Sequence, residues 1–303
     1  MSQRNILLCG LLEDPHLQQV GNALQRSGHA ITIWNSRDPQ TIEQLQWNIP
    51  KNNSVSKWDA IWVRQLPPLF PSAHIQSNGL CHVNAIRKQR SLRSFFLQWL
   101  IHQQEIGTRL LPRLQEGSYD QNKGHQLQLA RRSGLSVPHT YCTNNNAAAM
   151  TFTQENETPC IIKPIIGGAL AQTADKTNIT QMLRDFGPIM VQAHVTGKPC
   201  RVLWLDDRCL GAFELPITPT VDWRALFEQP DAMPVWQSIQ LSEPTEERLR
   251  RFVHGQSCQL LGFDFIRTED DFVFLEANTA PAWCDLPLEP SQKISEAVAQ
   301  FLA

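Results

Sequence analysis

The chain has 303 residues, of which 42% are hydrophobic, and its 27 Lys and Arg against 29 Asp and Glu give a formal net charge of −2. At about 150 residues per domain, this length suggests two domains or one large α/β unit. The nearly balanced charge, with no long run of one sign, argues against a broad nucleic-acid or membrane surface. No segment approaches the roughly 18 apolar residues of a bilayer-spanning helix, and the first apolar patch is too short for a secretory signal.

The first third of the sequence alternates between strand and helix patterns. Short apolar runs bounded by turn residues predict strands, and apolar residues at helical spacing predict helices between them. We expect strands at 5–10, 30–34, 58–65 and 108–112, and helices at 16–28 and 82–104. The order strand, helix, strand indicates a βαβ unit and a parallel sheet. The turn after the first strand lacks G-x-G-x-x-G, so a dinucleotide site of that kind is not expected.

The rest of the sequence mixes helices with strands that short turns connect. Helices are expected at 121–134, 146–151, 243–262 and 291–303. Strands are expected at 139–143, 159–164, 188–193, 263–268 and 272–278. A further hairpin is expected to turn at Asp206 and Asp207. The eight cysteines include no C-x-x-C pair and several lie in apolar runs, so we interpret them as buried thiols in a reducing cytoplasm.

Three side-chain oxygens fall in an apolar, strand-like stretch near the end of the chain. The sequence GFDFIRTEDDFVFLEANTAPAW contains Asp264, Glu276 and Asn278. Glu276 and Asn278 are two residues apart and therefore share one face of a strand, and the acidic turn between the strands brings Asp264 across from them. Two carboxylates and an amide oxygen on one face fit a hard cation such as Mg²⁺. The alternative is a set of solvent-facing residues at strand ends, although a carboxylate among apolar neighbours requires a cation or an arginine.

Three basic residues lie where they could meet a phosphate or these carboxylates. Lys163 ends the apolar run CIIKP before a glycine-containing loop, so it can serve as a point charge for a phosphate, or else extend from a strand end into solvent. Arg201 lies within an apolar strand, and an inward arginine usually pairs with a carboxylate or a phosphate. Lys123, near a helix start, cannot be distinguished from an exposed lysine by its position alone.

The ordered set of Lys123, IIKP, VQAHVTGKPCRV, LGFDFI and FLEAN resembles the ATP-grasp ligases. The closest resemblance is to the RimK-type ligases and the microviridin-type (graspetide) ligases, and it covers nearly the whole chain. The segment VDWRA resembles part of the graspetide branch. The resemblance implies an α/β (α+β) chain with an ATP-grasp fold behind an N-terminal parallel-sheet domain. The expected division is 1–118 for the N-terminal pre-ATP-grasp domain, 119–190 for the central subdomain and 191–303 for the C-terminal subdomain.

The resemblance also implies a role for each matching residue. The nucleotide-binding residues would be Lys123, Lys163, Gln192, Ala193, His194 and Val195, of which the last four form a hinge beside adenine. The ligands of one or two Mg²⁺ ions, or of Mn²⁺ in their place, would be Asp264, Glu276 and Asn278. The catalytic residues would be Arg201 and Lys163, which stabilise the transferred phosphate or an acyl phosphate. The family hinge usually carries a carboxylate after Gln192, where this chain has Ala193 and His194.

The activity implied by the resemblance is an ADP-forming carboxylate ligation. Transfer of the γ-phosphoryl group would turn a carboxylate into an acyl phosphate, which an amine or hydroxyl then attacks to give an amide or an ester. Such a transfer depends on positioning and charge neutralisation, so it needs no Ser-His-Asp or Cys-His set, and none is found. Two alternatives remain open. One is a nucleotide-binding scaffold or sensor without ligase activity, and the other is a phosphotransferase that stops at the phosphorylated product.

The expected partner is an amino acid or peptide substrate in the cytoplasm, with no nucleic acid and no membrane. An oligomer of identical chains is expected by analogy with the family alone. The segments Arg64–Pro68 and Glu214–Arg224 are candidates for an acceptor or leader-peptide site, although both could be plain connections. Arg64, at a strand end, is a candidate for binding a substrate carboxylate.

Overall fold

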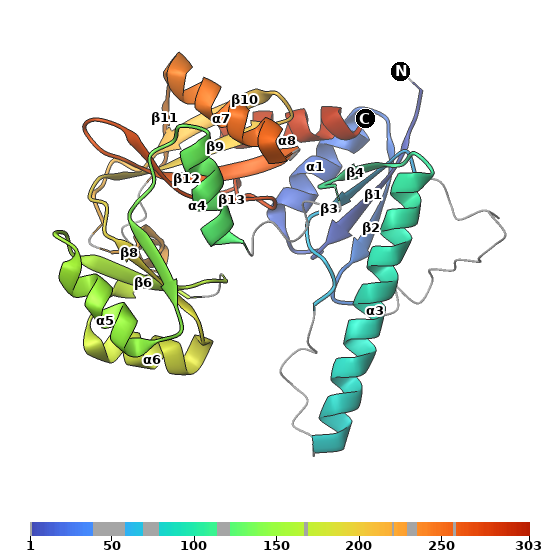
Figure 1. Cartoon of the computed structure of the whole chain (residues 1–303). Helices are drawn as coiled ribbons and strands as arrows, with labels where there is room; N and C mark the ends of the chain where they lie inside the picture. The colour runs from blue at the N-terminus through green and yellow to red at the C-terminus, as the bar shows by residue number, and fades with distance from the viewer. Residues whose placement is uncertain are drawn as a thin grey trace. The chain divides into compact units, whose positions relative to one another are not determined.

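A computed structural model describes residues 2–38, 58–68, 79–113, 122–166, 169–219, 221–228, 235–256 and 259–303. Within it the chain forms two compact units (Figure 1). Unit 1 comprises Met1–Leu114, Ala282–Cys284 and Leu288–Ala303, and unit 2 comprises Gln115–Pro281 and Asp285–Pro287. The expected mixture of a parallel sheet with antiparallel sheets and helices is confirmed.

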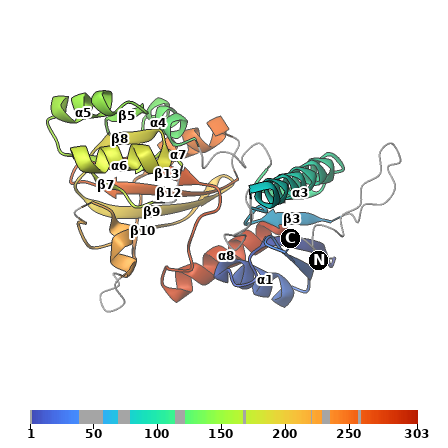
Figure 2. The same ribbon diagram turned by 90° about the horizontal axis from the view of Figure 1, so that it is seen from below.

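Unit 1 is built on a four-stranded parallel sheet, sheet A, in the order β2-β1-β3-β4. Its strands are β1 (Asn5–Gly10), β2 (Ala30–Asn35), β3 (Ala60–Val63) and β4 (Arg109–Leu111). Its helices are α1 (Pro15–Arg26), α3 (Gly79–Glu105) and α8 (Leu288–Leu302). Helix α1 packs against α8, which also contacts β3, as Figure 2 shows. Helix α3 packs its aromatic residues Phe96 and Trp99 against Leu7 and Cys9 of β1.

Local sequence explains where α1 begins and ends. Asp14 is the N-cap residue, and its carboxylate accepts a hydrogen bond from the backbone N–H of His16 at 2.8 Å. Pro15 occupies the first turn, where its missing N–H is not needed. Gly28 stops the helix with a φ of 83°, a conformation that suits glycine. The predicted helix at 16–28 is therefore present with boundaries shifted by one or two residues.

Unit 2 contains two antiparallel sheets. Sheet C has the order β5-β8-β6-β7, and α5 and α6 cover one of its faces (Figure 1). Its strands are β5 (Thr140–Thr143), β6 (Cys160–Pro164), β7 (Gln172–Thr173) and β8 (Ile189–Ala193), and its helices are α5 (Asn146–Glu155) and α6 (Lys176–Phe186). Apolar residues such as Phe152, Ile162 and Ile179 fill the interface between this sheet and its helices. The opposite face of sheet C carries Lys163 and Gln192 beside the apolar residues Ile161 and Met190.

Sheet B of unit 2 has the order β11-β10-β9-β12-β13. Its strands are β9 (Lys198–Leu205), β10 (Arg208–Glu214), β11 (Gln237–Ile239), β12 (Leu260–Arg267) and β13 (Phe272–Asn278). Helices α4 (Lys123–Arg132) and α7 (Glu243–Gln256) pack on this sheet, and η3 (Trp223–Glu228) is a short 3-10 helix. Four phenylalanines, Phe252, Phe263, Phe265 and Phe274, form the centre of this core with ring centroids 5.4–6.4 Å apart. The expected hairpin turns at Asp206, which adopts a φ of 55°.

The structure adds elements that the sequence patterns did not predict and corrects two expectations. The helix expected at 243–262 ends at Gln256, and residues 260–262 belong to strand β12 instead. Strands β7 and β11 and helix α6 were not predicted. Of the cysteines whose side chains the structure describes, all six are free thiols, but Cys142 is exposed and only Cys9, Cys160 and Cys200 are fully buried. Burial raises the pKa of the Cys200 thiol to about 12. No helix in the described part of the chain combines the length and apolar character that crossing a bilayer requires.

Replacing Phe274 with Ala should destabilise unit 2, because this fully buried ring contacts Phe252, Phe263 and Phe265. We expect the free energy of unfolding to fall by about 3–5 kcal/mol, measured by denaturant titration. The matched control is Phe186→Ala in α6, whose ring is 46% exposed and should cost less than about 0.5 kcal/mol. Equal losses in the two variants would contradict the core as described.

Candidate functional site

Three polar side chains form a row across the strands of sheet B. Arg201 on β9 lies opposite Asp264 on β12, which lies opposite Glu276 on β13. Opposed residues of paired strands project to the same face, and Asn278 shares that face because it is two residues beyond Glu276. The arrangement expected from strand spacing is therefore present.

Each carboxylate of this row is paired with a basic side chain. The Lys123 ammonium lies 2.6 Å from Glu276 Oε2, and Arg201 Nε lies 3.0 Å from Asp264 Oδ1. Asn278 Nδ2 donates a long hydrogen bond of 3.4 Å to Glu276 Oε1. Burial makes these pairings necessary, because an unpaired buried carboxylate is unstable.

Lys123 reaches Glu276 because of the way α4 docks on β13. Gln126, one turn into α4, is fully buried. Its amide Nε2 donates to the carbonyl of Ala277 at 2.8 Å, and its Oε1 accepts from the Ala277 N–H at 2.9 Å. Ala277 lies between Glu276 and Asn278, so this two-bond contact fixes the first turn of α4 beside the carboxylate. Lys123 is itself buried, which rules out the reading of an exposed lysine at a helix start.

Lys163 projects from the face of sheet C that is opposite helices α5 and α6. It lies opposite Met190 of β8, and Gln192 of the same strand shares that face. Gln192 Nε2 donates to Thr140 Oγ1 at 2.8 Å. Burial lowers the pKa of Lys163 from 10.5 to about 8, and this effect outweighs the attraction of Glu276. The nearby carboxylates of Glu276 and Asp222 favour the charged form of Lys163, in which it can bind an anion.

The two opposed carboxylates differ in how readily they take a proton. Burial raises the pKa of Asp264 above its ordinary value despite the adjacent Arg201 guanidinium. Burial acts on Glu276 as well, but the positive charges of Lys123 and Lys163 outweigh it and lower the pKa of that carboxyl. Glu276 therefore stays ionised more readily than Asp264, as expected when two nearby carboxylates have different neighbours.

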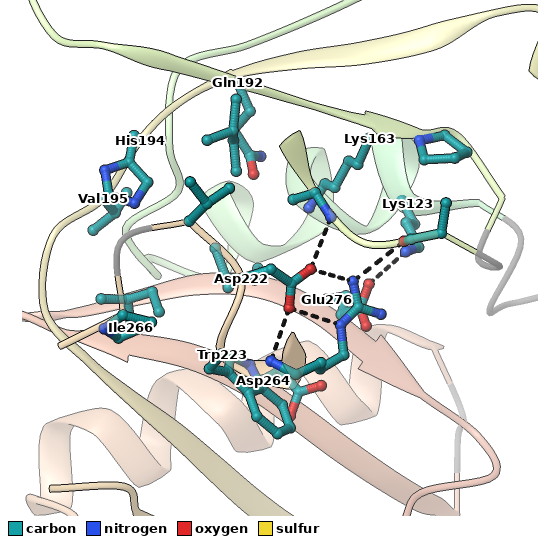
Figure 3. A pocket seen from close by; sticks show the side chains of 18 of the residues that line it. Lys123, Lys163, Gln192, His194, Val195, Asp222, Trp223, Asp264, Ile266 and Glu276 are labelled. Carbon is teal, nitrogen blue, oxygen red and sulfur yellow. Dashed lines mark hydrogen bonds and ion pairs between the residues drawn. The ribbon is translucent and has the colours of Figure 1, made fainter. Parts of the chain in front are cut away.

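Asp222, just before η3, and Arg224, within it, contact the segment before β7 at the edge of the site, where Figure 3 labels Asp222. Asp222 Oδ2 accepts a hydrogen bond from the Ala171 N–H at 2.8 Å and pairs with Arg224 at 2.6 Å. Arg224 Nη2 also donates to the carbonyl of Ala169 at 3.4 Å. Burial would raise the pKa of Asp222, but hydrogen bonds from Arg224 and Ala171 lower it below its ordinary value. The sequence marked Glu214–Arg224 only as a candidate substrate segment and did not assign these two residues.

A cavity of about 80 Å³ lies between sheets C and B of unit 2. The predicted site residues that line it are Lys123, Lys163, Gln192, Ala193, His194, Val195, Asp264 and Glu276. Figure 3 shows the two lysines and Glu276 pointing toward one another from different elements. Arg201 and Asn278 lie in the adjoining row and are not among the lining residues. Ligand pockets usually measure about 300–1,000 Å³, so this cavity is smaller than a typical ligand pocket.

The hinge between β8 and β9 forms one wall of the cavity. Two of its backbone donors are already used, because the Ala193 N–H bonds the carbonyl of His139 at 2.9 Å and the His194 N–H bonds that of Pro159 at 2.8 Å. Burial lowers the pKa of His194, which favours a neutral imidazole. A ligand at this wall would therefore meet a neutral, largely apolar surface that includes Val195 and Ile266.

No protein-family model and no curated protein sequence matches the chain. Solved structures do match it over nearly its whole length. The ATP-grasp ligase PsnB in complex with a minimal precursor is 22% identical, with 99% of both chains covered and a TM-score of 0.77. The macrocyclase MdnC of Microcystis aeruginosa, bound to precursor peptide MdnA, is 19% identical, with 99% of both chains covered and a TM-score of 0.78. This chain has the ATP-grasp fold.

A more distant structure agrees with this fold. The RimK-domain ATP-grasp protein of Sphaerobacter thermophilus is 11% identical, covers 98% of this chain and 99% of its own, and has a TM-score of 0.63. The expected resemblance to RimK-type and graspetide-type ATP-grasp ligases is therefore confirmed. The fold alone does not assign roles to side chains, so the roles of the site residues follow from their geometry.

The oxygen atoms that the row offers as ligands suit a metal ion that is also bound to a phosphate. Within the described segments, no three His, Cys, Asp or Glu side chains converge on one point. Mg²⁺ commonly takes one or two carboxylates and completes its shell with phosphate oxygens and water. Asp264, Glu276 and Asn278 provide such a partial set. The residues present therefore fit Mg²⁺ bound to a nucleotide better than a self-sufficient metal site.

Arg64, which the sequence suggested as a ligand for a substrate carboxylate, has partners within unit 1. Its Nε lies 3.1 Å from Asp14 Oδ2, and its guanidinium carbon lies 5.7 Å from the ring centre of Trp283. Its side chain is almost fully buried by these neighbours. The geometry supports a packing role for Arg64.

Lys163 should titrate near pH 8, because burial disfavours its charged form. Between about pH 8 and 10.5 the unfolded chain holds this proton and the folded chain does not, so the contribution of Lys163 to the free energy of unfolding rises with pH over that interval. The measurement is the NMR titration of ¹³C-labelled lysine side chains. The Lys163→Arg variant identifies the resonance by its loss. A Lys163 resonance that titrates above pH 10 would contradict the described burial.

Proposed function

We propose that this protein is an ATP-dependent ligase that activates a carboxylate of a peptide or amino acid as an acyl phosphate and joins it to a nucleophile. The observation that carries the proposal is the convergence of Lys123 and Lys163 on Glu276 and Asp264 inside one cavity. Solved complexes of PsnB that contain Mg and ADP, with a minimal precursor, support the nucleotide and metal by analogy of fold. The cofactors proposed for this chain are therefore ATP and Mg²⁺, with Mn²⁺ as a substitute.

Different residues of the cavity would bind different parts of the nucleotide. The hinge at 192–195 offers an apolar wall to adenine, while Lys123 and Lys163 contact the phosphates. Asp264, Glu276 and Asn278 would hold the metal, which would supply positive charge to neutralise the phosphate oxygens. The guanidinium groups of Arg201 and Arg224 lie near the carboxylates, and they would stabilise the negative charge of the acyl phosphate.

The ion pairs of the structure imply that metal and nucleotide bind together. Glu276 is neutralised by Lys123, and Asp264 by Arg201, so a metal ion alone meets carboxylates that already have counter-charges. When a phosphate takes the Lys123 ammonium, Glu276 becomes available to the metal. Each ligand then improves the site for the other, which is positive coupling between the two binding events.

Binding of ATP also requires the cavity to open. At about 80 Å³ it is smaller than a nucleotide site, and the contacts from Asp222 to Ala171 and from Arg224 to Ala169 connect the segment at η3 to the segment before β7. We propose that these contacts break as the nucleotide binds and that Arg224 then turns to the transferred phosphate. The Asp222 carboxylate, released from these hydrogen bonds, would then be available to accept the proton of the attacking nucleophile.

A peptide is the substrate class that the comparisons favour. PsnB and MdnC were both solved with precursor peptides, and these chains match the present one from end to end. We extend a peptide substrate to this chain on that basis, with ATP converted to ADP and phosphate in the cytoplasm. The domain division at 118 and 190 and an assembly of identical chains remain part of the proposal.

The proposed ligase should consume ATP in the presence of an acidic peptide and Mg²⁺, and hydroxylamine should trap its intermediate as a hydroxamate. The test combines a peptide library, an ADP-release assay and mass spectrometry, with Lys163→Met as the inactive control. A phosphorylated product that resists hydroxylamine would identify a phosphotransferase. If the protein binds nucleotide but releases no ADP with any peptide of the library, the result would favour a role as a scaffold or sensor.

A further inference from the structure

Arg201 has a second carboxylate partner besides Asp264. Its Nη1 donates to Asp285 Oδ2 at 3.3 Å, while its Nε donates to Asp264 Oδ1 at 3.0 Å. The guanidinium carbon also lies 5.3 Å from the ring centres of both Trp223 and Trp236. Arg201 is only 8% exposed. Two carboxylates and two aromatic faces therefore surround one guanidinium.

Trp236 holds Asp285 as well as contacting Arg201. Its indole Nε1 donates to Asp285 Oδ2 at 3.1 Å, the same oxygen that accepts from Arg201. Trp236 is itself fixed, because it is buried and packs edge-on against Trp223 with ring centroids 5.4 Å apart. The orientation of the Asp285 carboxylate is thus set by a rigid donor rather than by Arg201 alone.

The role proposed for Asp264 explains why the Arg201 guanidinium has two carboxylate partners. Under the proposed function, Asp264 donates its oxygens to a metal that is bound to the nucleotide. A buried guanidinium that lost an adjacent carboxylate at that step would be destabilised. Asp285 lies beyond the row, on the segment that follows β13, and its contact with Arg201 does not involve Asp264.

We propose that Asp285, oriented by Trp236, is a positioning residue that retains Arg201 in place and so releases Asp264 for the metal–nucleotide complex. The inference rests on the proposed function, since it concerns the same site. It also gives a role to the part of the chain after Asn278. Without Asp285, the metal would have to compete with Arg201 for Asp264.

The test uses the variant Asp285→Asn, which removes the charge and keeps the shape and an acceptor for Trp236. Binding of the ATP analogue AMPPNP is measured by calorimetry over a Mg²⁺ titration. We expect the Mg²⁺ concentration for half-maximal binding to rise about tenfold or more, the effect of losing a charge-assisted contact. Excess Mg²⁺ should restore the wild-type affinity, a rescue that a merely structural defect would not allow.

Two further variants keep the inference falsifiable. Asp271→Asn is the matched control, because Asp271 pairs with Arg248 at 3.5 Å outside the cavity and its side chain is 35% exposed against 29% for Asp285. It should leave the Mg²⁺ requirement unchanged. Trp236→Phe keeps a ring beside Arg201 but loses the donor to Asp285, and it should shift the requirement in the same direction as Asp285→Asn.

The double variant Arg201→Met with Asp285→Asn distinguishes positioning from folding. Once Arg201 is absent, Asp285 has nothing to hold, so the double variant should show the Mg²⁺ requirement of Arg201→Met alone. An unchanged requirement in Asp285→Asn, or a loss of affinity that excess Mg²⁺ does not restore, would overturn the inference. Failure of the wild-type protein to bind AMPPNP at any Mg²⁺ concentration would instead overturn the proposed function itself.

Discussion

Two carboxylates that face each other across paired strands set the main constraint on unit 2. Asp264 and Glu276 lie in register on β12 and β13, in a part of the sheet that is largely removed from water. Like charges at this spacing cannot remain without counter-charges. The chain meets the requirement with basic residues from three separate elements, namely Lys123 from α4, Arg201 from β9 and Lys163 from β6. The cavity exists where these elements converge.

The polar contacts around this row hold α4 and the cavity edge in place. Gln126 fixes α4 on the backbone of Ala277, which carries Lys123 to Glu276. Asp222 attaches the segment before η3 to Ala171 at the other side of the cavity. The site is therefore assembled from buried, directional contacts, while the phenylalanine core on the opposite face of sheet B supplies packing.

Much of this site could be predicted because the sequence patterns that indicate it lie within short segments of the chain. The two-residue spacing of Glu276 and Asn278 places them on one face whatever the rest of the chain does. Resemblance to a family then supplied the nucleotide-binding set, whose members prove to line one cavity. Helix α6 was missed although its signals are present, since Asp175 caps its start through the Asn178 N–H and Gly187 follows its end. Strands β7 and β11 have two and three residues, too few for a periodic pattern.

Other features could not be read from sequence because they depend on contacts between distant segments. Asp285 meets Arg201 across 84 residues and Trp236 across 49, and no local pattern distinguishes it from an exposed aspartate. Gln126 lies 151 residues from Ala277, and a buried glutamine in a helix leaves no periodic signature. The exposure of Cys142 likewise follows from its place on the edge strand β5 of sheet C, which the apolar pattern did not disclose.

The most direct test of the account is the Mg²⁺ dependence of ATP and ADP binding in the wild-type protein and in Glu276→Gln. The account predicts that Mg²⁺ strengthens nucleotide binding in the wild type and that the substitution removes this dependence while the protein stays folded. It would be contradicted by a wild-type protein that binds no nucleotide. It would equally be contradicted by a Glu276→Gln variant whose binding responds to Mg²⁺ as strongly as that of the wild type.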